Sequence, residues 1–479
     1  MRVDVGPAAA DILFVLAGFG ILNGVGFLRS SLTDVVAAIG LAFLAGVCFV
    51  MTLAIALLTI GVPFRLPAFV ALSLATAAFG LLSRREWLWA LRLRRSTLRS
   101  PSSAIREITL ERAIACLAII GFGIYAVIGT LAARVQPLNA WDAWSIWTRK
   151  AEVLFFSGSL PSDFFTSSAY VFMHPDYPIL LPVFESVQFR AMGTIDTQAI
   201  HVQFWLLLIA FVWAILYLGL RRGTILEWLP LAIVVSIAPA VYGQLFTAYA
   251  DIPMALLLAL GVLLLGEWLL TSDRRMLALS VLFLVGSANT KNEGLMAAVV
   301  ALVVAAALTA VGTKRADLKP LGLAAAAFVA GILPWRIWIA AHGIHGDIRL
   351  RDGLNPSYLA SHADRIWPSV QSLYAQLIDQ TSWLYIVPFG AGVALACLFV
   401  RQRRSLAAFY LATGMLAFAA LIWIYWISPT VPLDFYLASS AYRVVSVLTA
   451  IAFATVLQLA PPRAARPSAD PPDALAERP

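Results

Sequence analysis

The sequence predicts an all-α, polytopic transmembrane protein with about 13 spanning helices and an outer loop that carries interfacial helices. Hydrophobic residues make up 61% of the chain and charged residues only 13%, whereas soluble domains contain roughly 25% charged residues. Apolar runs near the length of about 20 residues that crosses a bilayer recur along the chain. These observations exclude a soluble protein. The formal net charge of +8 indicates membrane topology and not nucleic-acid binding, because the basic residues gather in particular loops.

The candidate spans are read from apolar runs bounded by polar or turn-forming residues. Two of them, at 66–82 and 276–289, are short, so the count is approximate. The full set covers residues 9–28, 35–60, 66–82, 112–133, 200–220, 228–247, 252–270, 276–289, 294–311, 320–341, 382–400, 405–427 and 439–460.

Other simple features fit a membrane protein. Cys48, Cys116 and Cys397 all lie in apolar runs, so we expect small core residues and neither a disulfide framework nor a metal site. The chain does not start with a basic region followed by a cleavage site, so the first apolar run is predicted to be a retained span.

Lysine and arginine residues set the predicted orientation. They are concentrated in alternate loops, which the positive-inside rule places in the cytoplasm. The N-terminus is then outside and the C-terminus inside. The residues that carry this argument are Arg29, Arg84, Arg85, Arg92, Arg94, Arg95, Arg99, Arg106, Arg112, Arg221, Arg222, Arg274, Arg275, Lys314, Arg315, Lys319, Arg401, Arg403 and Arg404.

The same pattern divides the chain. A basic cytoplasmic loop at 84–111 separates a three-span unit, 1–83, from a larger transmembrane unit, 112–460. The larger unit has two outward loops, at 134–199 and 342–381. The tail at 461–479, rich in proline and alanine, is predicted to be disordered.

The first polar cluster follows the fourth span. Trp141 and Asp142 are followed by two further tryptophans and by Arg149 and Lys150. Tryptophan favours the membrane–water interface, and the apolar spacing over 141–158 predicts an amphipathic helix lying in that interface. Asp142 is either an acid that acts on a lipid-linked substrate or the solvated acid of an anchor, and the local pattern fits both.

Two further clusters lie on the predicted outward face. In the second, prolines flank Asp176 and Tyr177 after His174 and fix a rigid loop, which either presents a polar group or simply re-enters the membrane. His174 could ligate a metal, although a lone histidine usually does not. In the third, Asp251 and Pro253 begin a span, which is ordinary chemistry for a helix start, yet this places a second acid on the face of Asp142.

The remaining clusters contain cations. Lys291, Asn292 and Glu293 interrupt an apolar interval, where a charge is costly unless it is paired or functional. Lys291 either holds a phosphate or pairs with Glu293 to cap a helical hairpin. Arg443, after two serines, either binds phosphate or extends along the helix to reach water.

In this order the five clusters resemble the GT-C superfamily of polytopic membrane glycosyltransferases, specifically the bacterial relatives of protein O-mannosyltransferases and aminoarabinose transferases. The resemblance covers residues 114–460 and rests on Trp141-Asp142, His174–Pro178, Tyr249–Pro253, Lys291–Gly294 and Ser439–Arg443. The three N-terminal spans depart from the simplest family plan, and the tail is too short for a soluble C-terminal domain.

The resemblance implies transfer of a sugar from a polyprenyl-phosphate donor to an acceptor hydroxyl of a glycan, glycolipid or protein. The reaction would invert the anomeric carbon at the periplasmic face of a bacterial inner membrane. Asp142 would be the general base, with Asp251 assisting it or positioning the acceptor. Donor and acceptor contacts would come from Trp141, Arg149, Lys150, His174, Asp176, Tyr177, Lys291, Asn292, Glu293 and Arg443.

Three alternatives stay open on the sequence. No cofactor is certain, and because acids are not densely clustered we expect no obligatory metal, although a divalent cation such as Mg²⁺ or Mn²⁺ is used by some relatives. A transporter or flippase for lipid-linked sugars would also need ionisable groups in the membrane. An O-antigen-ligase-like enzyme would share the carrier but use another acceptor.

Overall fold

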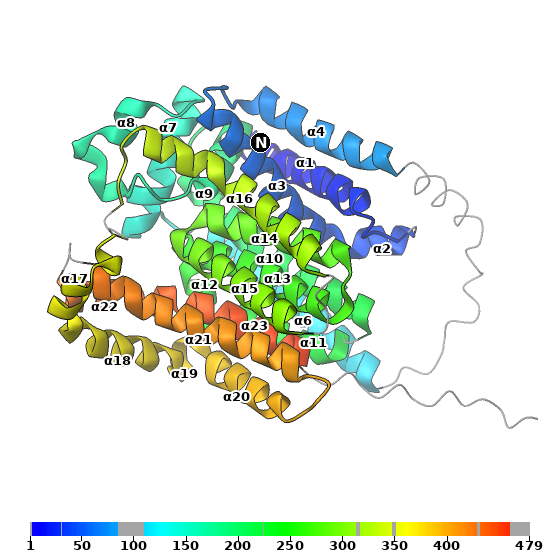
Figure 1. Cartoon of the computed structure of the whole chain (residues 1–479). Coiled ribbons are helices and arrows are strands. Elements are labelled where there is room, and N and C mark those ends of the chain that lie inside the picture. Colours follow the sequence, from blue (N-terminus) through cyan, green and yellow to red (C-terminus); the bar gives the residue numbers. More distant parts are fainter. Residues whose placement is uncertain are drawn as a thin grey trace, which may run out of the picture.

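The computed structural model describes residues 2–29, 31–84, 110–223, 225–312, 317–346, 351–428 and 432–459, and these are arranged as a bundle of helices (Figure 1). No strand occurs within these ranges. The chain is therefore an all-α, multi-pass membrane protein, as predicted. The predicted basic loop at 84–111, apart from its terminal residues, and the predicted tail at 461–479 lie outside the described residues.

The first half of the chain contains the N-terminal helices and the long predicted outer loop. Its helices are α1 (Arg2–Gly24), α2 (Leu32–Ala37), α3 (Ile39–Thr59), α4 (Leu66–Ser83), α6 (Leu110–Arg134), the π-helix η3 (Ala143–Trp147), α7 (Thr148–Ser157), α8 (Ser162–Thr166), the 3₁₀-helix η4 (Ser168–Met173), α9 (Leu180–Met192) and α10 (Thr197–Arg222).

The second half alternates long helices with short ones. It contains α11 (Ile225–Ile237), α12 (Pro239–Phe246), α13 (Asp251–Thr271), α14 (Arg274–Thr290), α15 (Asn292–Val311), α16 (Leu318–Ala341), η6 (Asp352–Leu354), α17 (Pro356–Ser361), η7 (Ala363–Arg365), α18 (Ile366–Leu377), α19 (Gln380–Trp383), α20 (Ile386–Leu398), α21 (Arg404–Ile427), α22 (Leu433–Val444) and α23 (Ser446–Leu459).

Each of the thirteen predicted spans coincides with a helix or a pair of helices. Within the described ranges, ten helical segments are long and apolar enough to cross a membrane, or eleven if α11 and α12, which meet at a bend of 52°, form one span. α14 and α20 have only 17 and 13 residues. The count of about 13 therefore stays a prediction, while the multi-pass architecture is confirmed.

The predicted N-terminal three-span unit is packed into the common core. Glycines let α1 approach α3 and α4 closely, since a Cβ at Gly46 would lie 1.9 Å from the Phe14 carbonyl oxygen and one at Gly80 1.8 Å from that of Gly20. Asp11 of α1 accepts hydrogen bonds from Gln188 of α9 at 3.0 Å and Gln203 of α10 at 3.2 Å. These polar contacts attach the unit to the helices that surround it.

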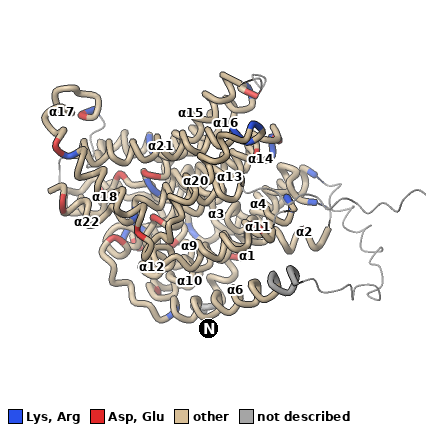
Figure 2. The backbone as a smooth tube through the Cα atoms, turned by 90° about the horizontal axis from the view of Figure 1, so that it is seen from below, with Lys and Arg blue, Asp and Glu red and all other residues tan. Residues whose placement is uncertain are grey.

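Basic residues gather at one end of the bundle. Four arginines from three separate loops bond to groups there: Arg221 to the Phe27 carbonyl, Arg222 to Glu267, Arg275 to the Gly26 carbonyl and Arg403 to the Leu459 carbonyl. Figure 2 shows a second set of charged segments among the helices near α12, α18 and α22, with mostly uncharged chain between. The contacts agree with the prediction that these basic loops share one face.

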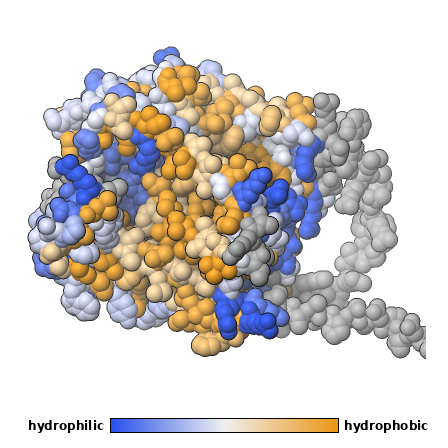
Figure 3. Space-filling view, viewed as in Figure 1, coloured by the Kyte–Doolittle hydropathy of each residue, from blue (hydrophilic) through white to orange (hydrophobic). Residues whose placement is uncertain are grey.

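An apolar belt separates the two ends. Figure 3 shows hydrophobic surface across the middle of the molecule between hydrophilic patches. Inside this belt, α13 is apolar on all sides and almost wholly buried, as expected for a helix at the centre of a bundle. It runs from Asp251 at one end to Glu267 near the other, about 24 Å at 1.5 Å per residue.

Candidate functional site

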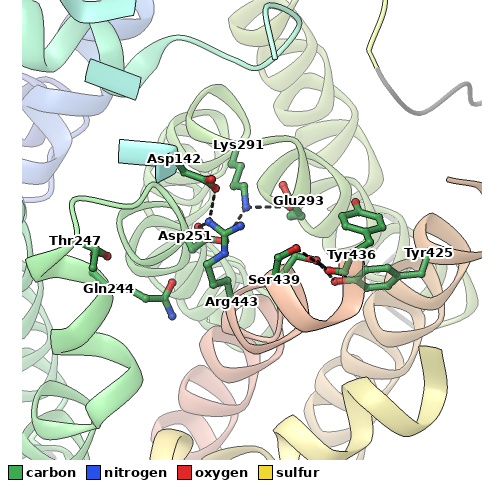
Figure 4. Close-up of polar contacts among 11 residues, drawn as sticks. Asp142, Gln244, Thr247, Asp251, Lys291, Glu293, Tyr425, Tyr436, Ser439 and Arg443 are labelled. Atoms are coloured by element: carbon green, nitrogen blue, oxygen red, sulfur yellow. Dashed lines mark hydrogen bonds and ion pairs between the residues drawn. The ribbon is translucent and has the colours of Figure 1, made fainter. Parts of the chain in front are cut away.

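The end of the bundle away from the basic loops holds a continuous chain of ion pairs (Figure 4). Arg443 pairs with Asp142 and lies 3.9 Å from Asp251 Oδ2. Lys291 Nζ contacts Asp251 Oδ1 at 2.6 Å and Glu293 Oε1 at 3.0 Å. We call these five residues the ion-pair cluster; they come from four of the five sequence clusters.

Asp142 is placed by an unusual turn. It immediately precedes η3, a single π-helical turn that ends at Trp147. Such turns are rare and often mark functional sites. Trp141 is 57% exposed, whereas Trp147 is buried and stacks on Tyr177 with ring centroids 5.7 Å apart. The helix predicted over 141–158 is present as η3 and α7, but Trp147 is a core residue and not part of an interfacial anchor.

Breaks between helices place the other charges. Ala248 has φ of 54°, in the left-handed region, just before α13 begins at Asp251. Lys291 is extended, with φ of −154°, and divides α14 from α15. Asp251 and Glu293 consequently lie in the first turns of α13 and α15, where the helix dipole favours negative charge.

The centre of the cluster is buried, and its hydrogen-bonding groups are not all paired. Asp251 is 1% and Lys291 5% exposed, and charges at such depth persist when they are paired. Three acids face two cations. Within the described residues, Asp251 Oδ2, Glu293 Oε2 and Arg443 Nε have no hydrogen-bond partner. The cluster therefore retains hydrogen-bonding capacity for a ligand.

Aromatic rings, but not the neighbouring serine hydroxyls, contact Arg443. Its guanidinium lies 4.7 Å from the centroid of the Tyr249 ring and 6.0 Å from that of Tyr442. Ser440 is within 2.8 Å of the Tyr425 hydroxyl and donates to the Tyr436 carbonyl, and Ser439 also donates to that carbonyl. The serines thus bond within the protein, and the arginine is the group that joins the cluster.

A second network lies beside the cluster. Asn292 donates to Asp176 Oδ2 at 3.4 Å, and Arg336 donates to Asn292 Oδ1 at 2.8 Å. The Trp335 indole donates to the Asp176 carbonyl at 3.2 Å. Because Asn292 lies between Lys291 and Glu293 in sequence, this network connects the proline-rich loop to the ion-pair cluster.

Lys150 lies beneath the proline-rich loop. It is fully buried and donates to the His174 carbonyl at 2.6 Å, with the rings of Trp147 and Tyr177 at 5.7 and 5.8 Å. Burial lowers the pKa of Lys150 to about 7, while the negative charge of Asp176 opposes that shift. The structure thus joins Lys150 to the backbone of this loop, where His174 adopts φ of 47°.

Arg149 points elsewhere. It pairs with Glu152 at 2.8 Å on α7, with nearly half of its side chain exposed. Of the predicted site residues, five form the cluster and Asp176 and Asn292 form the neighbouring network, while Lys150 contacts the loop residues His174 and Tyr177. The described residues contain no group of three or more His, Cys, Asp or Glu side chains arranged to hold a metal ion.

Sequence reasoning overlooked several polar residues. Arg336 lies within an apolar span, and an arginine at membrane depth is itself a signal of function. Gln244 is a lone amide within an apolar stretch, and Glu185 lies in a helix with several other polar residues, so neither gave a local pattern to indicate a site.

Glu185 offers a pH-dependent test of the packing of this region. It is buried on α9, where the Thr148 hydroxyl donates to it at 2.9 Å. Burial raises the pKa of Glu185 from 4.5 to about 8, although the Thr148 hydrogen bond opposes this and the charge of Glu152 adds to it. Because the folded state binds this proton more tightly than the unfolded state, stability falls as the pH rises from 4.5 to 8.

We therefore expect Glu185→Gln to have little effect at pH 5 and to stabilise the protein at pH 8. The difference should grow by at most roughly 1.4 kcal/mol per pH unit. Thermal unfolding in detergent across this range measures the effect, with the exposed acid Asp163→Asn as the matched control. Parallel wild-type and Glu185→Gln curves would contradict the assignment.

Comparison of the chain with protein-family models, with curated proteins and with solved structures finds no match in any of the three.

Proposed function

We propose that the chain is a membrane glycosyltransferase of the GT-C type. It moves a sugar from a polyprenyl-phosphate donor to an acceptor hydroxyl of a glycan, glycolipid or protein at the periplasmic face of a bacterial inner membrane. The observation that carries the proposal is the ion-pair cluster, in which Asp142 and Arg443, 301 residues apart, pair beside the buried Asp251 and Lys291. A base for the acceptor and cations for a leaving phosphate are thereby brought together.

The proposed reaction is a direct displacement. The acceptor oxygen forms a bond to the anomeric carbon as the bond between that carbon and the phosphate oxygen breaks. Asp142 takes the acceptor proton, and the polyprenyl phosphate leaves with the bonding electron pair, its charge stabilised by Arg443 and Lys291. The configuration at the anomeric carbon is inverted.

The Asp142–Arg443 ion pair suggests the order in which donor and acceptor take part in the proposed reaction. Arg443 forms an ion pair with the Asp142 carboxylate. A donor phosphate competes for the same guanidinium, and its binding would release Asp142 to accept a proton. Donor binding would therefore precede activation of the acceptor.

The experiment uses the full chain in lipid nanodiscs with undecaprenyl phosphate as the probe. We expect undecaprenyl phosphate to raise the midpoint of thermal unfolding, and undecaprenol, which has the same tail without the charge, to have no effect. Radiolabelled hexosyl undecaprenyl phosphate, incubated with a bacterial envelope extract, should transfer its label to a product and release the carrier phosphate. Absence of both binding and transfer would overturn the proposal.

One observation favours a second candidate, a flippase for lipid-linked sugars. If α11 and α12 form one span, that span is broken by a bend of 52°, and broken helices are typical of transporters. The two functions differ in bond cleavage: a flippase moves the intact donor between leaflets, whereas the transferase cleaves it. An O-antigen-ligase-like enzyme would also cleave the donor and differs in its acceptor.

A further inference from the structure

Gln244 is a buried amide whose side chain has no partner. It lies on α12 and is 4% exposed. Neither its Oε1 nor its Nε2 makes a hydrogen bond to any described residue. An amide left without partners in a protein interior is costly, and a leucine of similar size would avoid that cost. The arrangement therefore points to a ligand that supplies the missing hydrogen bonds.

The position of Gln244 connects it to the ion-pair cluster. Its backbone carbonyl accepts hydrogen bonds from the Thr247 hydroxyl at 2.9 Å and from the Tyr249 amide at 3.2 Å. The ring of Tyr249 lies under Arg443. Figure 4 shows the Gln244 side chain projecting from α12 toward the side of the cluster where Asp251 and Arg443 lie.

Two atoms of the ion-pair cluster also lack hydrogen-bond partners within the described residues. Asp251 Oδ2 can accept a further hydrogen bond and Arg443 Nε can donate one. Together with the amide, they offer both donors and acceptors. A phosphate accepts hydrogen bonds only, so the amide oxygen and the free carboxylate oxygen would not suit it. A ligand with hydroxyl groups on adjacent carbons can both donate and accept hydrogen bonds, so it matches these donors and acceptors.

We propose that Gln244 binds two hydroxyl groups of the transferred sugar and sets the sugar specificity of the site. This inference rests on the proposed function, since the sugar is that of the polyprenyl-phosphate donor. Arg443 would hold the phosphate on one side of the anomeric carbon, and Gln244 would hold the sugar ring. Sites built to bond a hydroxyl discriminate strongly against analogues that lack it.

The test separates the sugar from the carrier. Binding of undecaprenyl phosphate is compared with binding of the same carrier bearing glucose, mannose, galactose or arabinose, using the full chain in nanodiscs. We expect wild-type protein to bind at least one glycosylated carrier about 10- to 100-fold more tightly than the bare carrier, as two hydrogen bonds of ordinary strength would give. Gln244→Leu should lose this increment and keep its affinity for the bare carrier.

Two further variants complete the design. Gln244→Glu keeps the size but replaces the amide donor with an acceptor, so it should also lose the increment, and it serves if the leucine variant does not fold. Gln198→Leu, at an exposed glutamine in the first turn of α10, is the matched control and should retain the increment. A deoxy sugar that lacks one of the two bound hydroxyls should lose part of the increment on wild-type protein and show no additional loss on Gln244→Leu.

The outcomes distinguish this inference from the proposed function. If the bare carrier does not bind, the proposed function fails and the inference fails with it. If the bare carrier binds but no glycosylated carrier binds more tightly, or if the Gln244 variants retain the increment, the inference alone is overturned.

Discussion

Asp142→Asn is expected to lower the rate of sugar transfer by about 10³-fold while donor binding becomes tighter, because the neutral amide no longer competes with the donor phosphate for Arg443. Positioned general acid–base groups typically contribute 10²- to 10⁴-fold, and an amide cannot take the acceptor proton. Arg443 retains Asp251 within 3.9 Å, so the variant keeps a counter-charge for the arginine and should fold. Single-turnover transfer from a prebound radiolabelled donor measures the chemical step directly.

The matched control is Asp163→Asn, since Asp163 is an exposed acid of the same loop that contacts none of the cluster. It should transfer sugar at the wild-type rate. Thermal unfolding of both variants separates lost chemistry from lost structure. Near-normal transfer by Asp142→Asn would remove this carboxylate from the mechanism, and Asp251 would become the candidate base.

The sequence predicted which residues come together at the candidate site, but it left the role of each residue open. Hydropathy and the distribution of basic residues predicted that Asp142, in the first outer loop, lies on the same outward face as Asp251, Lys291 and Arg443. The structure brings all four into contact. This succeeded because charged residues are excluded from the apolar belt, so few positions remain where polar groups can gather.

The sequence did not show which face of each helix points into the bundle. Spans such as α13 are apolar on every side, so periodicity does not reveal which face is turned inward. Arg149 and Lys150 are adjacent in sequence, yet one is half exposed and the other fully buried below the proline-rich loop. The π-helical turn after Asp142 changes which of the following side chains point into the bundle. The spacing of apolar residues did not predict this turn. Gln244 was missed because the sequence does not show that its side chain is buried without hydrogen-bond partners among the described residues.

Lys291→Met is expected to destabilise the protein by roughly 3–5 kcal/mol, the range measured when one partner of a buried ion pair is removed. The sequence pattern left two roles open for this lysine, a phosphate contact or a pair with Glu293, and the family resemblance implied the first, for which substitution would mainly weaken donor binding. In the structure, Lys291 is 5% exposed and lies within 3.0 Å of both Asp251 and Glu293. Its removal takes the closest cation from the buried Asp251 and from the partly buried Glu293, and leaves Asp251 with Arg443 at 3.9 Å.

The double variant Asp251→Asn/Lys291→Met distinguishes this explanation from a simple loss of packing. Removing one acid together with the lysine leaves the net charge of the cluster as it is in the wild type. The acid that remains beside the lysine position, Glu293, is the more exposed of the two, at 14%, and Arg443 still pairs with Asp142. We expect the double variant to recover most of the lost stability and to remain inactive in transfer. Arg149→Met, which breaks an exposed pair, should change stability by less than about 1 kcal/mol. Unfolding in detergent measures all three variants, and a Lys291→Met protein as stable as the wild type would show that the cluster does not depend on this charge.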